Sequence, residues 1–589
     1  MKKNIEDHLV FLYGKERGKA TLVRLKELLA GYRNRISRPH NIPERPLPLD
    51  ERDSIVITYG DQFRKKGENP LATLKGFFDS HVGNAVSGIH ILPFSPYSSD
   101  DGFSVIDYRQ VNPDFGTWDD IKRISGKYRL MADLVLNHIS ARSKWFREFL
   151  KGNEKYRDYF IVVPEGADLS KVVRPRALPL LTEFDTPWGK KKLWTTFSED
   201  QIDLNYKNPD LLLEMIDIML MYVEMGAQVI RLDAIAYLWK EFGTTCIHLE
   251  QTHRVVQLFR SVLGEVAPWV VIITETNVPH EENISYFGNG YNEAQMVYQF
   301  SLPPLVLDAF RRGEANHLTE WASTLGQIEG DVTFFNFLAS HDGVGVLPAH
   351  GILSEKELEG LVELALSKGG YVSYKATPEG EIPYELNISY YDAISKGEKT
   401  TDLRVKKFLS SQSIMLALKG IPGIYVHSLL ATPNYREGVE RTGVKRSINR
   451  KKFEIEEVET HLNDNDSEVK RVFDGYLALL RARRGEKAFD PLGKQEILEV
   501  ARQVFAVLRF ANDGGSRVLC LTNTSRKQCQ FGIDVSALNI RGGPSIGKED
   551  MTSERGSFAR DIISGKEYSI KKGQLIVDIN GYDTLWLRF

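Results

Sequence analysis

Charged side chains stand at the ends of several apolar segments that the sequence predicts as β-strands. In the stretch QVIRLDAIAY (228–237), Arg231 and Asp233 are two residues apart, so in a strand both point to the same face. Burying a charge is unfavourable unless the charge is paired or functional. The two side chains are therefore either an ion pair at the end of a strand or part of a site.

Polar residues follow other predicted strands in the same way. Three separate carboxylates, two histidines and an arginine that converge on one place are rarely structural. They suit a metal site, or glycoside chemistry with one carboxylate as nucleophile and another as acid/base. No HxH or HExxH element is present, and Arg231 would repel a cation, so glycoside chemistry is favoured and no metal is expected. The residues at the strand ends are Asp100, Asp101 and Phe103, Asn137 and His138, Arg231 and Asp233, Glu275, and His341 and Asp342.

The elements that must hold these residues are eight β-rich runs, mostly separated by helical patterns. Nearly continuous apolar strands alternating with helices indicate a parallel sheet covered by helices. Eight such units predict an α/β fold, a (β/α)8 TIM barrel, in which chemistry lies at the carboxyl ends of the strands. An open doubly wound sheet is the alternative. The runs are residues 54–59, 88–94, 129–137, 228–235, 269–275, 294–300, 334–340 and 420–426.

Two intervals between these runs are too long for simple connections and predict inserted subdomains at the loop face. After about residue 490, short alternating strands with turn signals predict a β-sandwich. The first fifty residues predict a helical extension, with apolar residues at helical spacing between residues 22 and 32. The expected domains are an extension 1–50, a catalytic barrel 51–138, 208–342 and 411–490, insertions 139–207 and 343–410, and a C-terminal domain 491–589.

The composition excludes several classes of protein. The chain has 589 residues and a net charge of −3, which gives no sign of nucleic-acid binding. It has three cysteines without metal-ligand spacing, so a reducing compartment is expected. No signal peptide and no run of eighteen apolar residues is visible, which predicts a cytoplasmic protein without a membrane partner. A homodimer is left open.

Four motifs occur in the order of a known enzyme family. VLNHIS, VIRLDAIAY, ITETN and FLASHDG resemble the four signature regions of glycoside hydrolase family 13, the α-amylase family. ITYGDQ, HILPFSPYSSDDGFSVIDY and SINRKK resemble its sucrose phosphorylase branch. Within that branch, RPRALPLLTEF, LWTTFSEDQIDLNY, TTCIHLEQTH and ITETNVPH resemble the glucosylglycerate phosphorylases. Glu385 stands where sucrose phosphorylases typically carry Gln, which argues against sucrose as the substrate.

The resemblance implies a role for each strand-end carboxylate. Asp233 would be the nucleophile that forms a β-glucosyl ester, and Arg231 would keep it ionised. Glu275 would be the acid/base, which requires a raised pKa. Asp342 would bind substrate hydroxyls most strongly in the transition state. The residues implied to bind substrate are Asp100, Phe103, His138, Arg231, Tyr237, His341, Glu385 and Arg450.

A phosphorylase uses phosphate where a hydrolase uses water, so it needs an anion site but no cofactor. Arginine suits oxyanions through bidentate hydrogen bonds. Arg174 and Arg176, in the RPR element of the first insertion, and Tyr384, in the second, are the candidates. The expected substrates are an α-glucoside, phosphate and glycerate or a similar acceptor.

The predicted reaction is reversible cleavage of 2-O-α-glucosylglycerate by phosphate, giving α-glucose 1-phosphate and glycerate. The alternative is a phosphorylase of the same branch that acts on sucrose, sucrose 6′-phosphate or glucosylglycerol. Weaker alternatives are an α-glucoside hydrolase or transglucosidase and a non-catalytic sugar-binding relative. A metal-dependent hydrolase is the least favoured.

Overall fold

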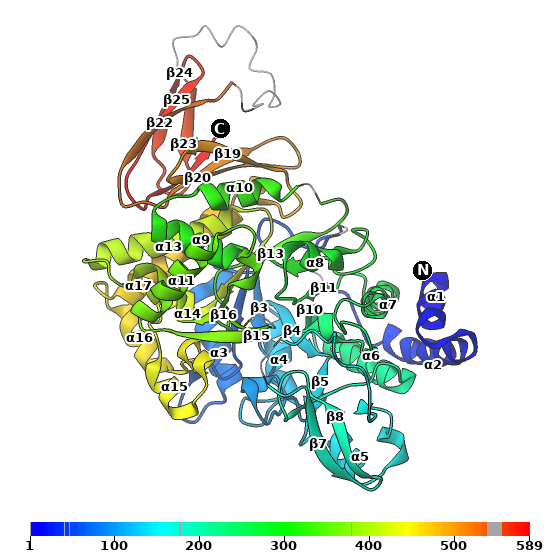
Figure 1. Cartoon of the computed structure of the whole chain (residues 1–589). Helices are drawn as coiled ribbons and strands as arrows, with labels where there is room; N and C mark the ends of the chain where they lie inside the picture. The colour runs from blue at the N-terminus through cyan, green and yellow to red at the C-terminus, as the bar shows by residue number, and fades with distance from the viewer. Residues whose placement is uncertain are drawn as a thin grey trace.

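The computed structural model describes residues 2–39, 42–45, 47–175, 178–326, 328–377, 380–536, 538 and 557–589. Its centre is a closed barrel of eight parallel strands that neighbour one another in chain order (Figure 1). All eight coincide with the predicted runs, so the expected (β/α)8 barrel is confirmed. The strands are β1 (Ile55–Thr58), β3 (Gly88–Ile91), β4 (Arg129–Val135), β10 (Ala227–Asp233), β11 (Val271–Thr274), β12 (Met296–Tyr298), β13 (Thr333–Phe337) and β17 (Ile421–Tyr425).

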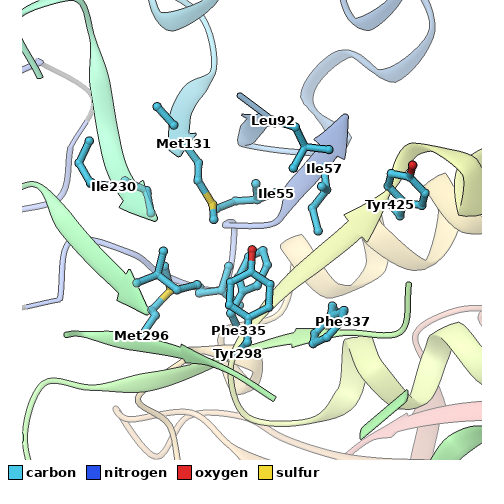
Figure 2. Packing of buried hydrophobic residues seen from close by; sticks show 14 of the residues in the cluster. Ile55, Ile57, Leu92, Met131, Ile230, Met296, Tyr298, Phe335, Phe337 and Tyr425 are labelled. Atoms are coloured by element: carbon cyan, nitrogen blue, oxygen red, sulfur yellow. The ribbon is translucent and has the colours of Figure 1, made fainter. Parts of the chain in front are cut away.

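Every residue of these strands is buried, which explains their continuous apolar sequence. Buried side chains such as Ile57, Met131 and Phe335 gather in the space that the strands enclose (Figure 2). A helix follows each strand before the next barrel strand begins. The helices are α3 (Pro70–Phe77), α4 (Trp118–Ser125), α6 (Pro209–Glu224), α7 (Glu250–Val266), α8 (His280–Ile284), α9 (Leu302–Arg312), α13 (Thr401–Ala417) and α17 (Glu468–Arg484).

Asn-Pro pairs start two of these helices. The side chain of Asn69 accepts a hydrogen bond from the backbone N–H of Ala72, and Pro70 occupies the first helical turn of α3. Asn208 accepts from Asp210 in the same way at the start of α6, where Pro209 follows. Proline is suited to this position because the N–H that it lacks has no partner in a helix anyway.

The two long intervals contain additional sheets. Between β4 and β10, the three strands β6 (Val162–Val163), β8 (Gly189–Trp194) and β7 (Leu181–Thr186) form an antiparallel sheet, and β5 (His138–Ser140) pairs with β9 (Gln201–Asp203). Between β13 and β17, the sheet is β14 (Val344–Gly345), β16 (Gly380–Asn387) and β15 (Tyr371–Thr377). Helices α5 (Lys144–Leu150), α11 (Glu355–Ser367) and α12 (Tyr390–Ser395) belong to these intervals.

The C-terminal part is an antiparallel sheet of eight strands, from β19 (Gln495–Ala501) to β26 (Thr584–Arg588). The edge strands β19 and β22 (Cys529–Asp534) lie near each other. Side chains from both ends of the strand order, for example Leu508 and Val577, share one core. The sheet thus encloses a hydrophobic interior of its own, as expected of the predicted sandwich.

The N-terminal residues form two helices, α1 (Lys2–Tyr13) and α2 (Lys15–Arg33), that pack against α6 and α7. The apolar face predicted from the sequence is the buried one, with Leu25 inaccessible and Tyr32 bonded to Asp217 of α6 at 2.7 Å. This extension therefore contacts the barrel in the protomer. Within the described parts of the chain, no helix is long and apolar enough to cross a membrane.

Candidate active site

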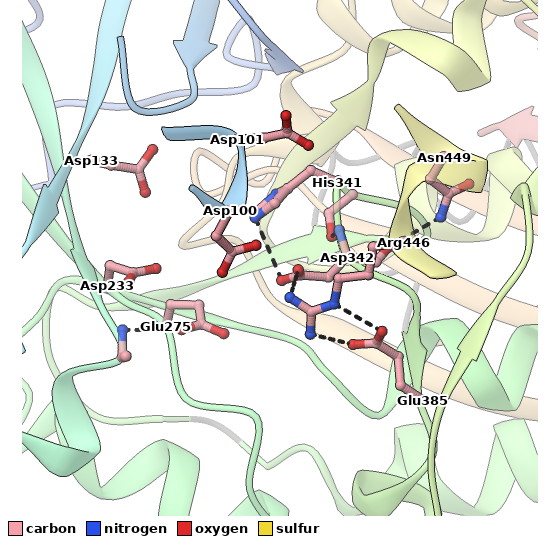
Figure 3. Close-up of polar contacts among 12 residues, drawn as sticks. Asp100, Asp101, Asp133, Asp233, Glu275, His341, Asp342, Glu385, Arg446 and Asn449 are labelled. Carbon is pink, nitrogen blue, oxygen red and sulfur yellow. Dashed lines mark hydrogen bonds and ion pairs between the residues drawn. The ribbon is translucent and has the colours of Figure 1, made fainter. Parts of the chain in front are cut away.

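A pocket that is open to solvent lies at the carboxyl ends of the barrel strands. Most of the site residues predicted from the sequence line it, although they come from five strand ends and the second insertion. Figure 3 shows the carboxylates facing one another across this pocket. The predicted residues in its lining are Asp100, Phe103, His138, Asp233, Glu275, His341, Asp342, Tyr384 and Glu385.

Arg231 lies behind the predicted nucleophile and does not line the pocket. Its Nη1 lies 2.6 Å from Oδ1 of Asp233 and also forms an ion pair with Asp133, which is its register partner on β4. Nε2 of His90 lies 2.6 Å from Oδ2 of Asp133. Burial alone would raise the pKa of Asp133, but Arg231 and His90 lower it below its usual value. The guanidinium is therefore shared between two carboxylates.

The chain turns sharply after Asp233. Ala234 has a φ of 49°, a left-handed conformation that a residue with a Cβ rarely adopts. In this conformation its backbone N–H donates to Oε2 of Glu275 at 3.1 Å. Strained backbone of this kind is found where the surrounding structure requires it, often at functional sites. Here it brings the ends of β10 and β11 together, so that both carboxyls face the pocket.

Asp233 and Glu275 titrate as an interacting pair. Burial raises the pKa of Asp233 to about 8, against the effect of Arg231 and with a further contribution from Glu275. The pKa of Glu275 is also raised, again mainly by burial. Arg231 lowers the pKa of Asp233, in the direction expected from the sequence, but it is shared with Asp133, and burial raises the pKa by more.

The pair nevertheless has a preferred position for a single proton. Arg231 contacts Asp233 at 2.6 Å, whereas its Nη2 lies 3.8 Å from Oε2 of Glu275. The closer cation stabilises the charged form of Asp233 more, so a proton shared by the pair is favoured on Glu275. The arrangement supplies one ionised and one protonated carboxyl, which is what a retaining glycosidic reaction requires.

We expect a bell-shaped dependence of kcat/KM on pH for an α-glucoside substrate, because burial raises the pKa of Glu275. Glu275 then keeps its proton to a higher pH than an ordinary carboxyl does, and activity falls once this general acid is ionised. At low pH both carboxyls are protonated and no nucleophile remains. Initial rates over pH 5–10 measure this. α-Glucosyl fluoride, whose leaving group needs no proton, is the control and should lack the alkaline limb.

The third predicted carboxylate is held by basic groups. Asp342 forms an ion pair with Arg446, and its Oδ2 lies 3.6 Å from Nε2 of His341. Burial would raise the pKa of Asp342, but the guanidinium groups of Arg446, Arg450 and Arg231 lower it well below its usual value. Burial lowers the pKa of His341 to about 3, so this imidazole is neutral. Asp342 is therefore ionised at the rim of the pocket.

Asp100 and Asp101 are two consecutive residues with positive φ. Asp100 lines the pocket, and its Oδ1 lies 3.7 Å from Nη1 of Arg450. Asp101 takes the closer contact with the same nitrogen, at 2.7 Å. Nε of Arg450 donates to the carbonyl oxygen of His341 at 2.9 Å. The predicted Asp100–Arg450 pair is thus part of a larger group, because Nη2 of Arg450 also lies 3.8 Å from Oδ1 of Asp342. Arg450 does not line the pocket.

Aromatic and histidine rings form part of the floor. Phe103 stacks on His341 with ring centroids 4.7 Å apart. Nε2 of His138 lies 2.8 Å from the carbonyl oxygen of Phe103, and both residues line the pocket. Tyr237 does not line it; its ring meets Phe197, a lining residue, edge to face at 5.8 Å.

Of the residues predicted to bind phosphate, Tyr384 lies at the pocket and Arg174 does not. Arg174 is exposed, donates to the carbonyl oxygen of Leu178 and is not among the lining residues. Arg176 lies outside the described residues. The RPR element still reaches the pocket, because Pro175 is part of the lining.

Sequence reasoning missed several residues that shape the site. Arg446 lines the pocket and contacts both Asp342 and Glu385, and Asp133 and His90 support Arg231 from neighbouring strands. A signal for Arg446 existed, because it lies four residues before Arg450 in RSINR. Among the residues that the structure describes, no group of three or more His, Cys, Asp or Glu side chains could hold a metal ion.

The α-amylase catalytic domain family matches residues 82–364. The glucosylglycerate phosphorylase of Spirochaeta thermophila is 54% identical over 585 residues, which cover 98% of this chain and 97% of that protein. The glucosylglycerate phosphorylase of Escherichia coli K12 is 44% identical, and the match covers 94% of this chain and 97% of that protein. The chain therefore belongs to the α-amylase family, glycoside hydrolase family 13, in the branch of the sucrose and glucosylglycerate phosphorylases.

Solved structures show the same fold. The crystal structure of sucrose 6F-phosphate phosphorylase from Thermoanaerobacter thermosaccharolyticum has a TM-score of 0.71 and 24% sequence identity, covering 91% of this chain and all of that one. The crystal structure of an α-amylase from H. orenii has a TM-score of 0.66 and 18% sequence identity, and the match covers 92% of this chain and all of that one. Both likenesses extend over more than nine tenths of this chain, so the overall fold is shared with these two proteins.

Proposed function

We propose that the protein is a retaining α-glucosyl phosphorylase. It reversibly cleaves 2-O-α-glucosylglycerate with phosphate to α-glucose 1-phosphate and glycerate. The observation that carries this proposal is 44–54% identity with glucosylglycerate phosphorylases over at least 90% of the chain. The pocket supports it, because Asp233, Glu275 and Asp342 line one cavity.

The first half of the reaction transfers the glucosyl unit to the enzyme. Asp233 attacks the anomeric carbon and forms a β-glucosyl ester, while Glu275 gives its proton to the departing oxygen of glycerate. Arg231, at 2.6 Å, stabilises the charge of Asp233 before attack. Asp342 and Asp100 bind sugar hydroxyls, and Phe103 offers an apolar face to the ring.

In the second half, phosphate replaces glycerate and attacks the same carbon from the side that glycerate left. Phosphate is already an anion at neutral pH, so it needs less help from a base than water does. Glu275, now ionised, accepts the remaining proton where one is present. The inorganic phosphate is a substrate in this scheme, and the residues of the site carry out both steps without a cofactor.

The test is an acceptor screen. The purified protein is incubated with phosphate and, in separate reactions, with glucosylglycerate, sucrose, sucrose 6′-phosphate and glucosylglycerol, and glucose 1-phosphate is measured. We expect the largest kcat/KM with glucosylglycerate. Glucose 1-phosphate from another glucoside at a higher kcat/KM would overturn glycerate as the acceptor, and release of free glucose alone would overturn the phosphorylase reaction.

We expect the product to be α-glucose 1-phosphate. Two successive inversions at the anomeric carbon restore its configuration. Proton NMR of the fresh product distinguishes the α- from the β-anomer by the coupling of the anomeric proton. A β-phosphate would contradict the covalent intermediate and with it the assignment of Asp233 as nucleophile.

A further inference from the structure

Arg446 is the only lysine or arginine among the described residues that line the pocket. The two histidines of the lining, His138 and His341, are neutral, because burial lowers the pKa of both imidazoles. The guanidinium side chain is 19% exposed, so it is accessible from the cavity. The carboxylates of the lining are Asp100, Asp233, Glu275, Asp342 and Glu385.

Two of these carboxylates fix the orientation of Arg446 (Figure 3). Nε and Nη2 donate to Oε1 and Oε2 of Glu385 at 3.0 and 2.5 Å, and Nη1 forms an ion pair with Asp342. Glu385 is only 2% exposed. A Cβ atom on Gly343 would lie 2.6 Å from Cγ of Glu385, which is too close for two carbon atoms. The absence of a side chain at Gly343 therefore lets Glu385 reach Arg446.

The guanidinium keeps donors for a ligand. Arginine carries five N–H groups in a planar fork. The contacts with Glu385 and Asp342 use three of them, which leaves one N–H on each terminal nitrogen. The bidentate contact with a buried carboxylate also restricts rotation of the side chain, so less freedom is lost when an anion binds.

We infer that Arg446 is the acceptor-subsite cation that binds the carboxylate of glycerate and, in phosphorolysis, the phosphate that replaces it. This inference rests on the proposed function. Both ligands are oxyanions that exchange at one carbon atom, so one cation can serve both. A pocket lined by carboxylates repels an anion unless a cation lies in contact with it, and charge-assisted hydrogen bonds from arginine supply that contact.

Asp342 couples this anion site to the sugar. Asp342 contacts Nη1 of Arg446. When the glucosyl unit is bound, its hydroxyls compete for the carboxylate of Asp342, and Nη1 becomes available to the anion. Glu385 remains the positioning residue that holds the other edge of the guanidinium. Tyr384, which also lines the pocket, lies next to Glu385 in the sequence.

The experiment compares an anionic acceptor with a neutral one of the same carbon skeleton. α-Glucosyl fluoride supplies the glucosyl-enzyme, and transfer to glycerate is measured against transfer to glycerol and hydrolysis by water. The variants are Arg446→Gln and Arg446→Lys. Arg441→Gln, at an exposed arginine of α15 (Arg436–Thr442), is the matched control.

For Arg446→Gln we expect the ratio of transfer to glycerate over transfer to glycerol to fall about 10- to 100-fold, the usual effect of losing a hydrogen bond to a charged group. In Arg446→Lys, which keeps the positive charge but not the planar set of N–H donors, this ratio should fall less. In Arg441→Gln the ratio should be unchanged. All rates of the Arg446 variants fall to some extent, because Asp342 loses a partner. Melting temperatures show whether each variant is folded.

If Arg446 only holds Asp342, transfer to glycerate, glycerol and water falls by the same factor, and the inference is overturned. The wild-type protein is tested first. If it does not transfer glucose to glycerate, the proposed function fails, and the ratio of transfer to phosphate over transfer to water then tests Arg446 separately. A fall in that ratio in Arg446→Gln supports the anion site, and an unchanged ratio overturns it.

Discussion

Replacing Asp233 by Asn should lower kcat/KM for every glucosyl donor by at least about 10³-fold, because the amide cannot form the glucosyl ester. The shape of the side chain is kept. Its Oδ1 can still accept from Nη1 of Arg231, which remains paired with Asp133, so no buried charge loses all its partners. The fold should therefore persist, and a melting temperature close to that of the wild type checks this.

Asp119→Asn is the matched control, because Asp119 is an exposed residue in the first turn of α4. It should retain full activity. A second variant, Asp233→Ala, leaves room for azide beside the sugar. An α-donor should then give β-glucosyl azide, because a single displacement inverts the configuration. If the Asp233→Asn variant kept a tenth of the wild-type activity, the assignment of Asp233 as nucleophile would be wrong.

Replacing Glu275 by Gln should lower kcat/KM for glucosylglycerate by about 10²- to 10⁴-fold, the usual contribution of a general acid. Glycerate leaves as an alcohol and needs the proton that Gln cannot supply. α-Glucosyl fluoride should be affected far less, since fluoride leaves without protonation. Rates with both donors, measured for the wild type and the variant, give the comparison directly.

The control for this variant is Glu281→Gln, at an exposed position of α8. It should leave both donors unaffected. Equal losses of activity with glucosylglycerate and α-glucosyl fluoride in Glu275→Gln would show that Glu275 does not act as the acid. Its role would then be to orient the sugar, or to hold Ala234 through the hydrogen bond that it accepts from the backbone N–H of that residue at 3.1 Å. A variant that loses its alkaline limb in the pH profile would support the acid role.

The barrel could be predicted from the sequence because its signal is local. A strand that is buried on both faces is apolar throughout, and all eight such runs became barrel strands. In a parallel barrel the carboxyl ends of the strands lie at one face, so the polar residue that ends each run must lie near the others. This is why Asp233, Glu275 and Asp342 could be assigned to one pocket before the structure was known.

The sequence by itself determined which strands carry the chemistry; the tertiary structure decided how the charges are paired. Arg231 is shared with Asp133, and Asp342 is joined through Arg446 to Glu385, which lies on a strand of the second insertion. These contacts depend on how loops meet after the barrel closes, and no periodic pattern encodes them. Burial of the whole group likewise sets the raised pKa of Asp233, because the loss of water acts only in the folded protein.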